Sequence, residues 1–400
     1  MRSQRDYIVT KEDVHGYANH WLSSSLKLEY EGTRCTASTL FQVLLIAASR
    51  MASVFAVCRD LADAPCDQTI RNALNESLPE IPELQRRLNL CLVTKLPKSL
   101  LSKSRRIAID LTLIPYHGQP QEDKKEIYRS APKSGTTHFH AYATAAVVHK
   151  GHRYTLGLLY VEHGEKMKAV LQKLLKIIRS RGVKVRFLLL DKGFFSVEVI
   201  SYLKRAGCGF IIPAIVRGRK PKGRKKATGL RAIQKKKHGY YRHTLRGKID
   251  GKDRSTQVTI CVASKQYQHK KTGQRKTKKL MYVISKVRQT PKEIREIYRT
   301  RFGIETSYRQ MNEARIKTCT RDPALRLLFV GIALVLRNVW VWLHFKLAKN
   351  KSSNEPKLFP KLLRFREMLL WIGQVVGRRL GAEQIQGIDR ETYKRVTENE

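Results

Sequence analysis

Alternating apolar and polar positions in the middle of the chain predict a sheet covered by helices. Strand patterns run over residues 106–114, 138–149 and 153–161, joined by short links. Helical periodicity over 165–181 precedes a short apolar strand at 185–190, a helix at 196–205 and another strand at 210–212. Three strands followed by helix, strand, helix and strand predict an α/β fold with a mixed sheet flanked by helices.

The segment before this sheet is predicted to be helical over residues 34–95. Apolar residues recur on most turns over 39–61, and the pattern is interrupted at 63–67. Pro65 cannot continue a helix, and Asp67 can cap a new one that begins at residue 68. The two helices could form a DNA-reading helix-turn-helix or simply pack on each other. We assign residues 1–100 to an N-terminal helical region with DNA binding as its expected role.

After the sheet, a strand pattern at 281–285 is followed by a long helix that Pro291 opens. The apolar run 327–336 continues through Arg337 and Asn338, and it is half of the ~20 residues that span a bilayer. We interpret it as a buried helix, so no membrane partner is expected. The polar N-terminus is unlike a signal peptide, and we expect a cytoplasmic, nucleoid-associated protein. Residues 346–400 are predicted to form a C-terminal helical region.

Charge narrows the class of partner. The 400 residues include 79 Lys and Arg against 33 Asp and Glu, a formal net charge of +46. Such self-repulsion favours a polyanionic partner, and nucleic acid is the leading candidate; a membrane surface and a solvated basic surface stay as alternatives. Seven cysteines without a Cys-x-x-Cys pair argue against a disulfide framework and a zinc ribbon, which fits a reducing compartment.

Basic residues are concentrated in residues 216–279, which hold 23 Lys and Arg against Asp250 and Asp253. Strand-like stretches at 240–245 and 257–263 predict an inserted basic β subdomain, with a disordered basic linker as the alternative. Tyr240, Tyr241 and Tyr267 could stack on unpaired bases or pack in the sheet. The insertion would divide the core into residues 101–215 and 280–345.

Two acidic residues lie where a surface position is not expected. Asp110 interrupts an apolar strand, where an unpaired charge is costly. Asp191 follows a buried strand, at the edge where open sheets place their ligands. The structural alternatives are a hydrogen-bonded core aspartate for Asp110 and a turn or N-cap residue for Asp191.

Glu305 is the third acid, on the helix that begins at Pro291. With about 100° per residue, four other polar side chains lie within about 40° of it on the helix: Tyr298, Arg301, Arg309 and Asn312. The alternative is a solvated face on which Glu305 pairs with arginines four residues away. Carboxylates on the first strand, the fourth strand and a later helix are what a two-metal site needs. Mg²⁺ prefers oxygen ligands, and two ions can promote phosphoryl transfer on a DNA backbone that the basic chain attracts.

The motifs around these acids resemble those of a family. They are Ile109-Asp110-Leu111-Thr112 with Tyr116-His117-Gly118, Leu190-Asp191-Lys192-Gly193-Phe194, and Tyr298-x2-Arg301-x3-Glu305. Over residues 105–345 the chain resembles a DDE transposase of a prokaryotic insertion sequence, with a ribonuclease H-like core. The last motif is similar to the Tyr-Arg-Glu-Lys signature of one group of these enzymes. Its Lys is replaced by Asn312, so Arg309 or Arg315 would have to supply the positive charge.

The resemblance implies that Asp110, Asp191 and Glu305 are catalytic and hold two Mg²⁺ ions, which Mn²⁺ can replace. Tyr298, Arg301, Arg309 and Asn312 would bind DNA. The N-terminal region and the insertion would bind terminal inverted repeats, and a homodimer would join the cut ends to target DNA in a synaptic complex. A non-catalytic DNA-binding relic of a transposase and a site-specific nuclease are the rival functions.

Two other groups of polar residues are weaker candidates. His138 and His140 lie on one strand face and could form a metal-binding pair, but they have no Cys or carboxylate partners nearby in sequence, so a structural role is expected. Glu162 and Glu165 are expected to be acids at a helix start, or otherwise an accessory metal ligand.

Overall fold

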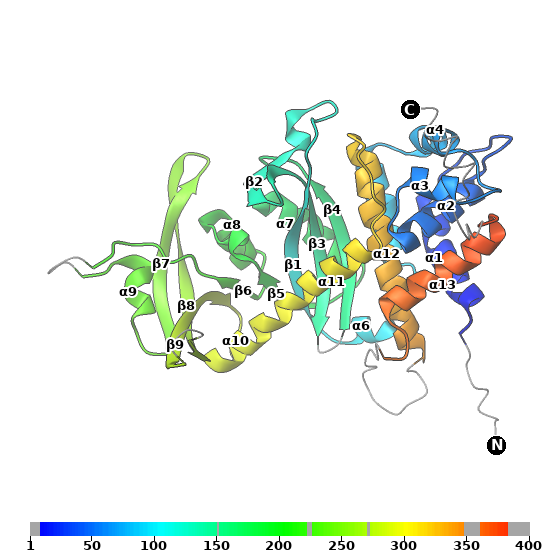
Figure 1. Ribbon diagram of the computed structural model, residues 1–400. Helices are drawn as coiled ribbons and strands as arrows, with labels where there is room; N and C mark the ends of the chain where they lie inside the picture. The colour runs from blue at the N-terminus through cyan, green and yellow to red at the C-terminus, as the bar shows by residue number, and fades with distance from the viewer. Residues whose placement is uncertain (1–8, 150–151, 222–225, 270–272, 348–360, 383–400) are drawn as a thin grey trace, which may run out of the picture.

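A nine-stranded mixed sheet forms the centre of the computed structural model (Figure 1). The structure describes residues 9–149, 152–221, 226–269, 273–347 and 361–382. The strand order is β2-β3-β1-β5-β6-β9-β8-β7, and β4 also pairs with β3. The predicted fold class, an α/β mixed sheet flanked by helices, is confirmed. The strands are β1 (Arg105–Pro115), β2 (Tyr128–Lys133), β3 (Thr136–His149), β4 (His152–Val161), β5 (Val185–Leu190), β6 (Phe210–Pro213), β7 (Gly239–Ile249), β8 (Lys252–Gln268) and β9 (Arg275–Ser285).

The register of the central strands brings two of the predicted acids together. β1 is parallel to β5 and antiparallel to β3. Ile109 is opposite Leu190, so Asp110 and Asp191 each come one residue after a paired position. Parallel strands end at the same edge of a sheet, and the two carboxylates therefore belong to neighbouring strands at that edge.

The first hairpin contains elements that the sequence pattern did not predict. β2 and the 3₁₀ helix η1 (Lys124–Glu126) lie between β1 and β3. β2 has the sequence YRSAPK and is mostly exposed, so it lacks the apolar alternation by which a half-buried strand is recognised. Its pairing with β3 supplies the order that its own side chains do not.

Helices cover both faces of the sheet (Figure 1). Successive strand residues point to opposite faces, which separates the buried side chains into two clusters. Odd positions of β1 such as Ile107 pack in the cluster that contains α7 (Met167–Ser180) and α8 (Val197–Arg205). Even positions such as Ala108 pack with α10 (Pro291–Arg299) and α11 (Gly303–Glu313). Asp110 therefore belongs to the face that α10 and α11 cover.

The long helix predicted from Pro291 is interrupted. Thr290 caps α10, and Pro291 occupies its first turn as expected. A 3₁₀ turn, η3 (Thr300–Phe302), then separates α10 from α11. The tighter winding of a 3₁₀ turn changes the angular position of every residue after it, so the angles calculated for one continuous α-helix do not hold across it.

The remaining helices form a body beside the sheet, at the opposite end of the molecule from β7 to β9 (Figure 1). α13 packs against α1 and α2, so segments from both ends of the chain share this body. The helix expected over 39–61 is divided at Met51, which has a left-handed backbone, and Cys66 rather than Asp67 is the N-cap residue of α4. The helices are α1 (Lys11–Leu26), α2 (Ala37–Arg50), α3 (Val54–Arg59), α4 (Asp67–Ser77), α5 (Ile81–Cys91), α6 (Lys98–Ser102), α12 (Pro323–Leu347) and α13 (Phe365–Arg379). Of the predicted C-terminal region, residues 348–360 and 383–400 lie outside the described residues.

α12 contains the apolar run noted in the sequence. By length and composition it is the one helix within the described ranges that could cross a membrane, but 94% of its most apolar window is buried in the protein. It packs against α5, α11 and β4. Its hydrophobicity is thus explained by the core that it fills, as the sequence interpretation proposed.

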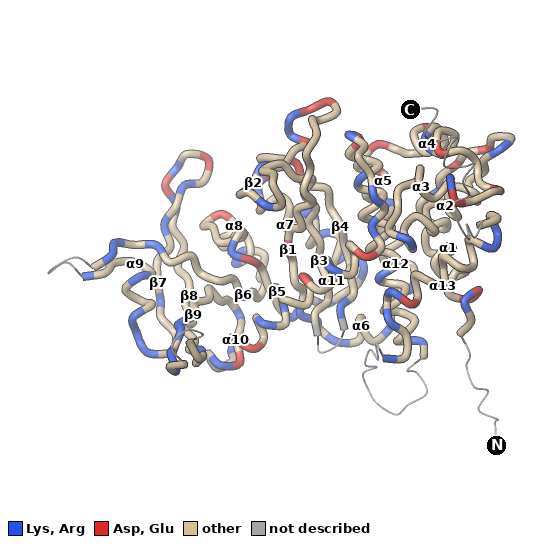
Figure 2. The backbone as a smooth tube through the Cα atoms, viewed as in Figure 1, with Lys and Arg blue, Asp and Glu red and all other residues tan. Residues whose placement is uncertain are grey.

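The described part of the basic segment 216–279 extends the central sheet. α9 (Gly229–Gln234) precedes β7, and the strands β7, β8 and β9 pair antiparallel and join the core sheet through β6. Figure 2 shows Lys and Arg distributed over these strands, with the acidic residues gathered at the turn between β7 and β8. The described residues therefore form strands as predicted, these strands carry part of the positive charge, and β9 continues across residue 279 into the core.

Candidate catalytic site

One guanidinium lies between the three predicted acids. The Arg301 Nη1 atom is 2.9 Å from Asp110 Oδ2, and its Nη2 atom is 2.9 Å from Glu305 Oε1 and 3.9 Å from Asp191 Oδ1. The acids come from β1, the end of β5 and α11, and Arg301 comes from η3. Residues up to 195 positions apart in the sequence therefore meet at a single side chain.

Asp110, Asp191 and Glu305 form a carboxylate cluster whose side chains differ in burial. The Asp110 side chain is 14% exposed, whereas those of Asp191 and Glu305 are each 44% exposed. One side of the cluster is thus closed by the sheet and the other is open to solvent. Asp191 precedes the 3₁₀ helix η2 (Lys192–Phe194) but makes no capping hydrogen bond with its side chain, so the N-cap alternative does not account for it.

Arg301 is held between two aromatic rings. Its guanidinium carbon is 5.5 Å from the centre of the Tyr298 ring and 5.2 Å from that of Phe302. Tyr298 is buried and donates its hydroxyl to the Leu190 carbonyl at 3.3 Å, so it also fixes α10 to the end of β5. Phe302 is 49% exposed at the open side. Exposure of a large ring beside the cluster identifies Phe302 as a candidate that the motif did not include.

The pKa values of Asp110 and Arg301 are shifted by burial and by the neighbouring charges. Burial raises the pKa of Asp110 to about 6, and Arg301 opposes the shift while Asp191 and Glu305 add to it. Burial disfavours the charge on Arg301, but Tyr298 and the three carboxylates outweigh burial and raise its pKa. The guanidinium is therefore charged at neutral pH and compensates part of the negative charge of the cluster.

Tyr308 is a second residue that the sequence reasoning missed. Its hydroxyl donates to the Asp110 carbonyl at 3.0 Å and accepts from the Thr144 hydroxyl at 2.7 Å. Both bonds are buried or nearly so, and they fix α11, which carries Glu305, to β1 and β3. In the sequence Tyr308 looks like one more apolar position of an amphipathic helix, so only the partner on β1 reveals its role.

The predicted helix stripe is only partly confirmed by these contacts. Tyr298, Arg301 and Glu305 gather at the cluster, and Arg301 and Glu305 form the ion pair expected four residues apart. Arg309 is exposed and makes no hydrogen bond or ion pair with any described residue. Asn312 is also exposed and accepts a 3.4 Å hydrogen bond from Arg315. Their predicted role in DNA binding stays a prediction.

The donor set fits hard divalent ions. All three acids offer carboxylate oxygens, which Mg²⁺ and Mn²⁺ prefer, and two of them face solvent. Among the described residues no group of three or more His, Cys, Asp or Glu side chains is already arranged to hold an ion. In this conformation the guanidinium of Arg301, not a shared point between oxygens, lies at the centre of the cluster.

Two of the weaker candidates, His140 and Glu165, lie in structural surroundings rather than at the cluster. His140 is fully buried with its ring 4.7 Å from that of Tyr116, and neither ring nitrogen has a hydrogen-bond partner within the described chain. Glu165 accepts from Lys173, and it precedes α7, which begins at Met167 rather than at 165. Tyr240 and Tyr267 are 46% and 40% exposed on the basic strands.

Comparison with known proteins identifies the family of this chain. The transposase DDE domain family matches residues 101–338, more than half of the chain and all three acids. No curated relative matches the chain significantly. One similar solved structure is titled a piggyBac transposase synaptic complex with hairpin DNA; it is 12% identical, with 98% of this chain and 85% of that chain covered, and its TM-score of 0.51 shows a shared fold. The chain therefore belongs to the DDE transposase domain family.

Proposed function

We propose that this protein is a DNA transposase of a prokaryotic insertion sequence, of the group with a Tyr-Arg-Glu-Lys signature. It cuts the ends of the element and joins them to target DNA by phosphoryl transfer that needs two Mg²⁺ ions, which Mn²⁺ can replace. The observation that carries the proposal is the meeting of Asp110, Asp191 and Glu305 at Arg301. A single carboxylate would be enough to form an ion pair with a buried arginine. Three carboxylates from three elements are therefore not explained by the stability of the fold.

Asp110, Asp191 and Glu305 would hold the ions. When bound, two divalent ions supply activation of the attacking oxygen and stabilisation of the leaving oxygen. The Leu111 amide donates to Asp110 Oδ1 at 3.0 Å, which leaves Oδ2 directed at the cluster. The Tyr308 hydroxyl holds the Asp110 backbone. Asp110 is thus oriented by the fold, whereas the more exposed Asp191 and Glu305 can adjust to the substrate.

The open side of the cluster would receive DNA. Phe302 offers an exposed ring on which a base can stack, and Arg301 lies directly beneath it. Arg309 and Asn312 lie further along α11, exposed and able to reach a phosphate. The motif Lys that this chain lacks would therefore be replaced by the Arg309 guanidinium.

The sheet extension would guide the DNA to this side. Cys261 of β8 packs with α10, and its cross-strand partner is Tyr240 of β7. Side chains an even number of residues apart on a strand share a face, so Arg242, Arg246 and Lys248 lie on the same face as Tyr240. This is also the face of Asp110, and all three residues are exposed. These three residues form a row that we call the basic row. A phosphate backbone along it would lead toward the carboxylate cluster.

A cutting assay tests the proposed chemistry. The purified protein should nick a duplex carrying the element's end when Mg²⁺ is added. Asp110→Asn, Asp191→Asn and Glu305→Gln should each lower the rate by about 10³-fold or more, because each removes a charged oxygen from the ion site. DNA binding should persist in all three variants. Equal binding with no cutting by the wild type would instead support the non-catalytic relic.

A joining assay separates a transposase from a site-specific nuclease. The cut end should become covalently linked to a second, unrelated duplex. A nuclease would release the end and leave the second duplex intact. Inverted repeats that flank the gene, with short direct duplications outside them, would support the insertion-sequence origin.

The proposed partners are terminal inverted repeats and target DNA, in a homodimeric synaptic complex in the cytoplasm. Support for the DNA partner comes from the charge of +46 and from a structural neighbour whose title names a synaptic complex with hairpin DNA. Sedimentation of the chain with and without end duplex would test the dimer: two protomers per pair of ends are expected.

A further inference from the structure

We propose that Arg301 is an internal counter-cation that divalent ions must displace, and that its release couples metal loading to DNA binding. The inference rests on the proposed function, because it assigns the metal site to the same carboxylates. It concerns a role of Arg301 in the protein before DNA arrives, in addition to any contact with a phosphate.

Competition follows from shared atoms. Asp110 Oδ2 and Glu305 Oε1 each accept a hydrogen bond from the Arg301 guanidinium at 2.9 Å. An ion that binds either oxygen competes with the guanidinium for the lone pairs of that oxygen, and it brings positive charge next to the guanidinium. Since like charges a few ångströms apart repel strongly at a half-buried site, ions and guanidinium cannot both occupy the centre of the cluster.

A buried arginine does not need acids in this fold. Arg337 of α12 is 1% exposed, and its described acceptors are neutral: the Gln310 side chain and the Arg153 carbonyl. Burial lowers the pKa of Arg337 to about 9. Arg301, by contrast, contacts Tyr298 and three carboxylates, which together raise its pKa. Its surroundings are therefore suited to holding charge rather than to filling space.

The surroundings of Arg301 also give it somewhere to move. It belongs to the 3₁₀ turn η3 rather than to the regular helices on either side. The rings of Tyr298 and Phe302 both lie within cation-π distance, and Phe302 borders solvent on the side where Asp191 and Glu305 are exposed. A guanidinium displaced along these rings remains partly compensated until a DNA phosphate binds it.

Two ligands that each favour the displaced position of Arg301 must help each other. Metal binding frees the guanidinium for a phosphate, and a phosphate that holds the guanidinium clears the carboxylates for metal. By linkage the two effects have the same size, which for coupled sites is about 5- to 150-fold. Without DNA, Arg301 would continue to compensate part of the negative charge of the cluster, and the cluster would stay weakly metallated.

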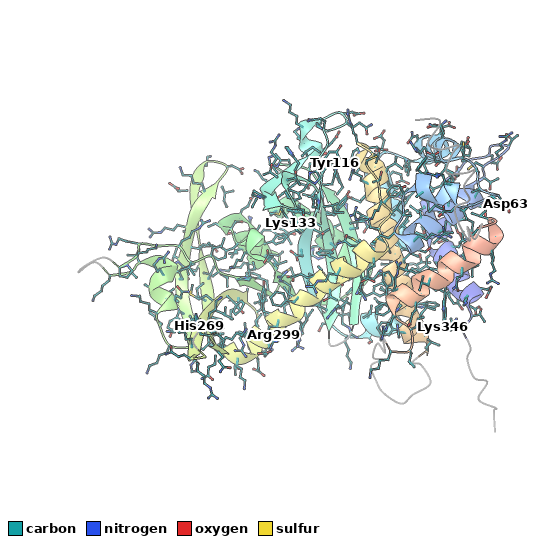
Figure 3. The ribbon with its side chains drawn as sticks, viewed as in Figure 1. Asp63, Tyr116, Lys133, His269, Arg299 and Lys346 are labelled. Carbon is teal, nitrogen blue, oxygen red and sulfur yellow. The ribbon has the colours of Figure 1, made fainter. Side chains whose placement is uncertain are left out.

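The test measures metal and DNA binding rather than cutting. Mn²⁺ is titrated into four proteins, with and without an end duplex: wild type, Arg301→Met, Arg301→Lys and Arg299→Met. The spectrum of unbound Mn²⁺ reports how much of the ion each protein binds. DNA affinity is measured in parallel with a chelator or with Ca²⁺. Arg299 is the matched control, since it lies two residues earlier, is 66% exposed and pairs only with Glu296 among the described residues (Figure 3).

In wild type and Arg299→Met, the duplex should tighten Mn²⁺ binding, and Ca²⁺ should tighten DNA binding, by the same factor. Arg301→Met should bind Mn²⁺ about 10-fold or more tightly without DNA, and the duplex should add little. Arg301→Lys, which keeps the charge but not the two-pronged contact, should fall between them and serves if Arg301→Met does not fold.

Unchanged or weaker Mn²⁺ binding by folded Arg301→Met would overturn the inference, because the guanidinium would then support the cluster instead of competing for it. Equal coupling in Arg301→Met and wild type would overturn it as well. Failure of every protein, wild type included, to bind Mn²⁺ with or without DNA would instead refute the proposed function.

Discussion

The carboxylate cluster and the basic row use charge in opposite ways on one face of the same sheet. At the cluster, one buried guanidinium contacts three acids through its Nη1 and Nη2 atoms at defined distances. Along the basic row, Arg242, Arg246 and Lys248 are exposed and none has an ion pair within the described chain. Position therefore matters at the first site, whereas summed charge matters at the second. Replacing one residue should be decisive only at the cluster.

The largest effect expected in this comparison is on DNA binding, when all three residues of the basic row are replaced together. Arg242→Gln, Arg246→Gln and Lys248→Gln together should weaken DNA binding about 100-fold at 0.15 M salt and lower the log-log salt slope by about 3. Thermal unfolding should hardly change, because these side chains are exposed. Anisotropy titrations across a salt series measure both quantities. A loss carried by one residue alone would contradict the idea of summed charge.

At the cluster, a single hydroxyl should have a measurable effect. Tyr308→Phe keeps the ring but leaves the Asp110 carbonyl and the Thr144 hydroxyl without their partner. We expect a loss of about 1–3 kcal/mol in unfolding free energy and a lower cutting rate, since α11 is less firmly fixed to β1. Mn²⁺ affinity should fall with the rate. Tyr241→Phe is the control, because its hydroxyl donates to the Lys237 carbonyl at an exposed position before β7, away from the cluster.

These sites also show which parts of the molecule the sequence could reveal. Apolar runs located Asp110 and Asp191 on two strands of one sheet, but the parallel pairing that makes these strands neighbours is seen in the structure. Glu305 was reached through helical spacing, although η3 interrupts that helix. Tyr308 and the central position of Arg301 depend on which side chains meet across elements. No spacing along one segment contains that information, so the sequence could not give them.

The same limit applies to element ends. The strands of the basic segment are longer than predicted: β8 spans Lys252–Gln268 where alternation indicated 257–263. Its outer residues are exposed on both faces and therefore carry no apolar signal. Pairing with β7 holds the first part of β8, from Lys252 opposite Ile249, and pairing with β9 holds the last part, up to Gln268 opposite Arg275. Backbone hydrogen bonds define these ends, and side-chain pattern cannot report them.

A buried histidine on the same sheet face tests how the fold treats a cationic group that has no acid beside it. Burial and the nearby Arg326 lower the pKa of His140 to about 3. An unfolded histidine titrates near 6.5, so the unfolded chain binds the extra proton between these values and folding stability falls as pH decreases through this window. His140→Phe, which keeps a ring against Tyr116, should remove about 2 kcal/mol of this loss at pH 5.

Denaturant unfolding of both proteins at pH 8 and pH 5 measures the effect of His140→Phe. The comparison between the two pH values cancels any change in packing, because packing contributes equally at both. An identical pH dependence in the variant and the wild type would mean that His140 is protonated in the folded protein and that the sheet tolerates an uncompensated cation there.

The smallest expected effect is at Arg299, and it carries the comparison furthest because Arg299 and Arg301 carry the same guanidinium two residues apart, one exposed and one buried among the acids. The Arg299 guanidinium bonds Glu296 at 2.9 Å on an exposed helix surface. Such pairs contribute at most about 0.5 kcal/mol, so Arg299→Met should change neither unfolding nor cutting by more than that. Differential scanning calorimetry and the nicking assay provide the measurements. If Arg299→Met slowed cutting as much as Arg301→Met, the charge of this turn rather than the contact with three carboxylates would be what the reaction uses.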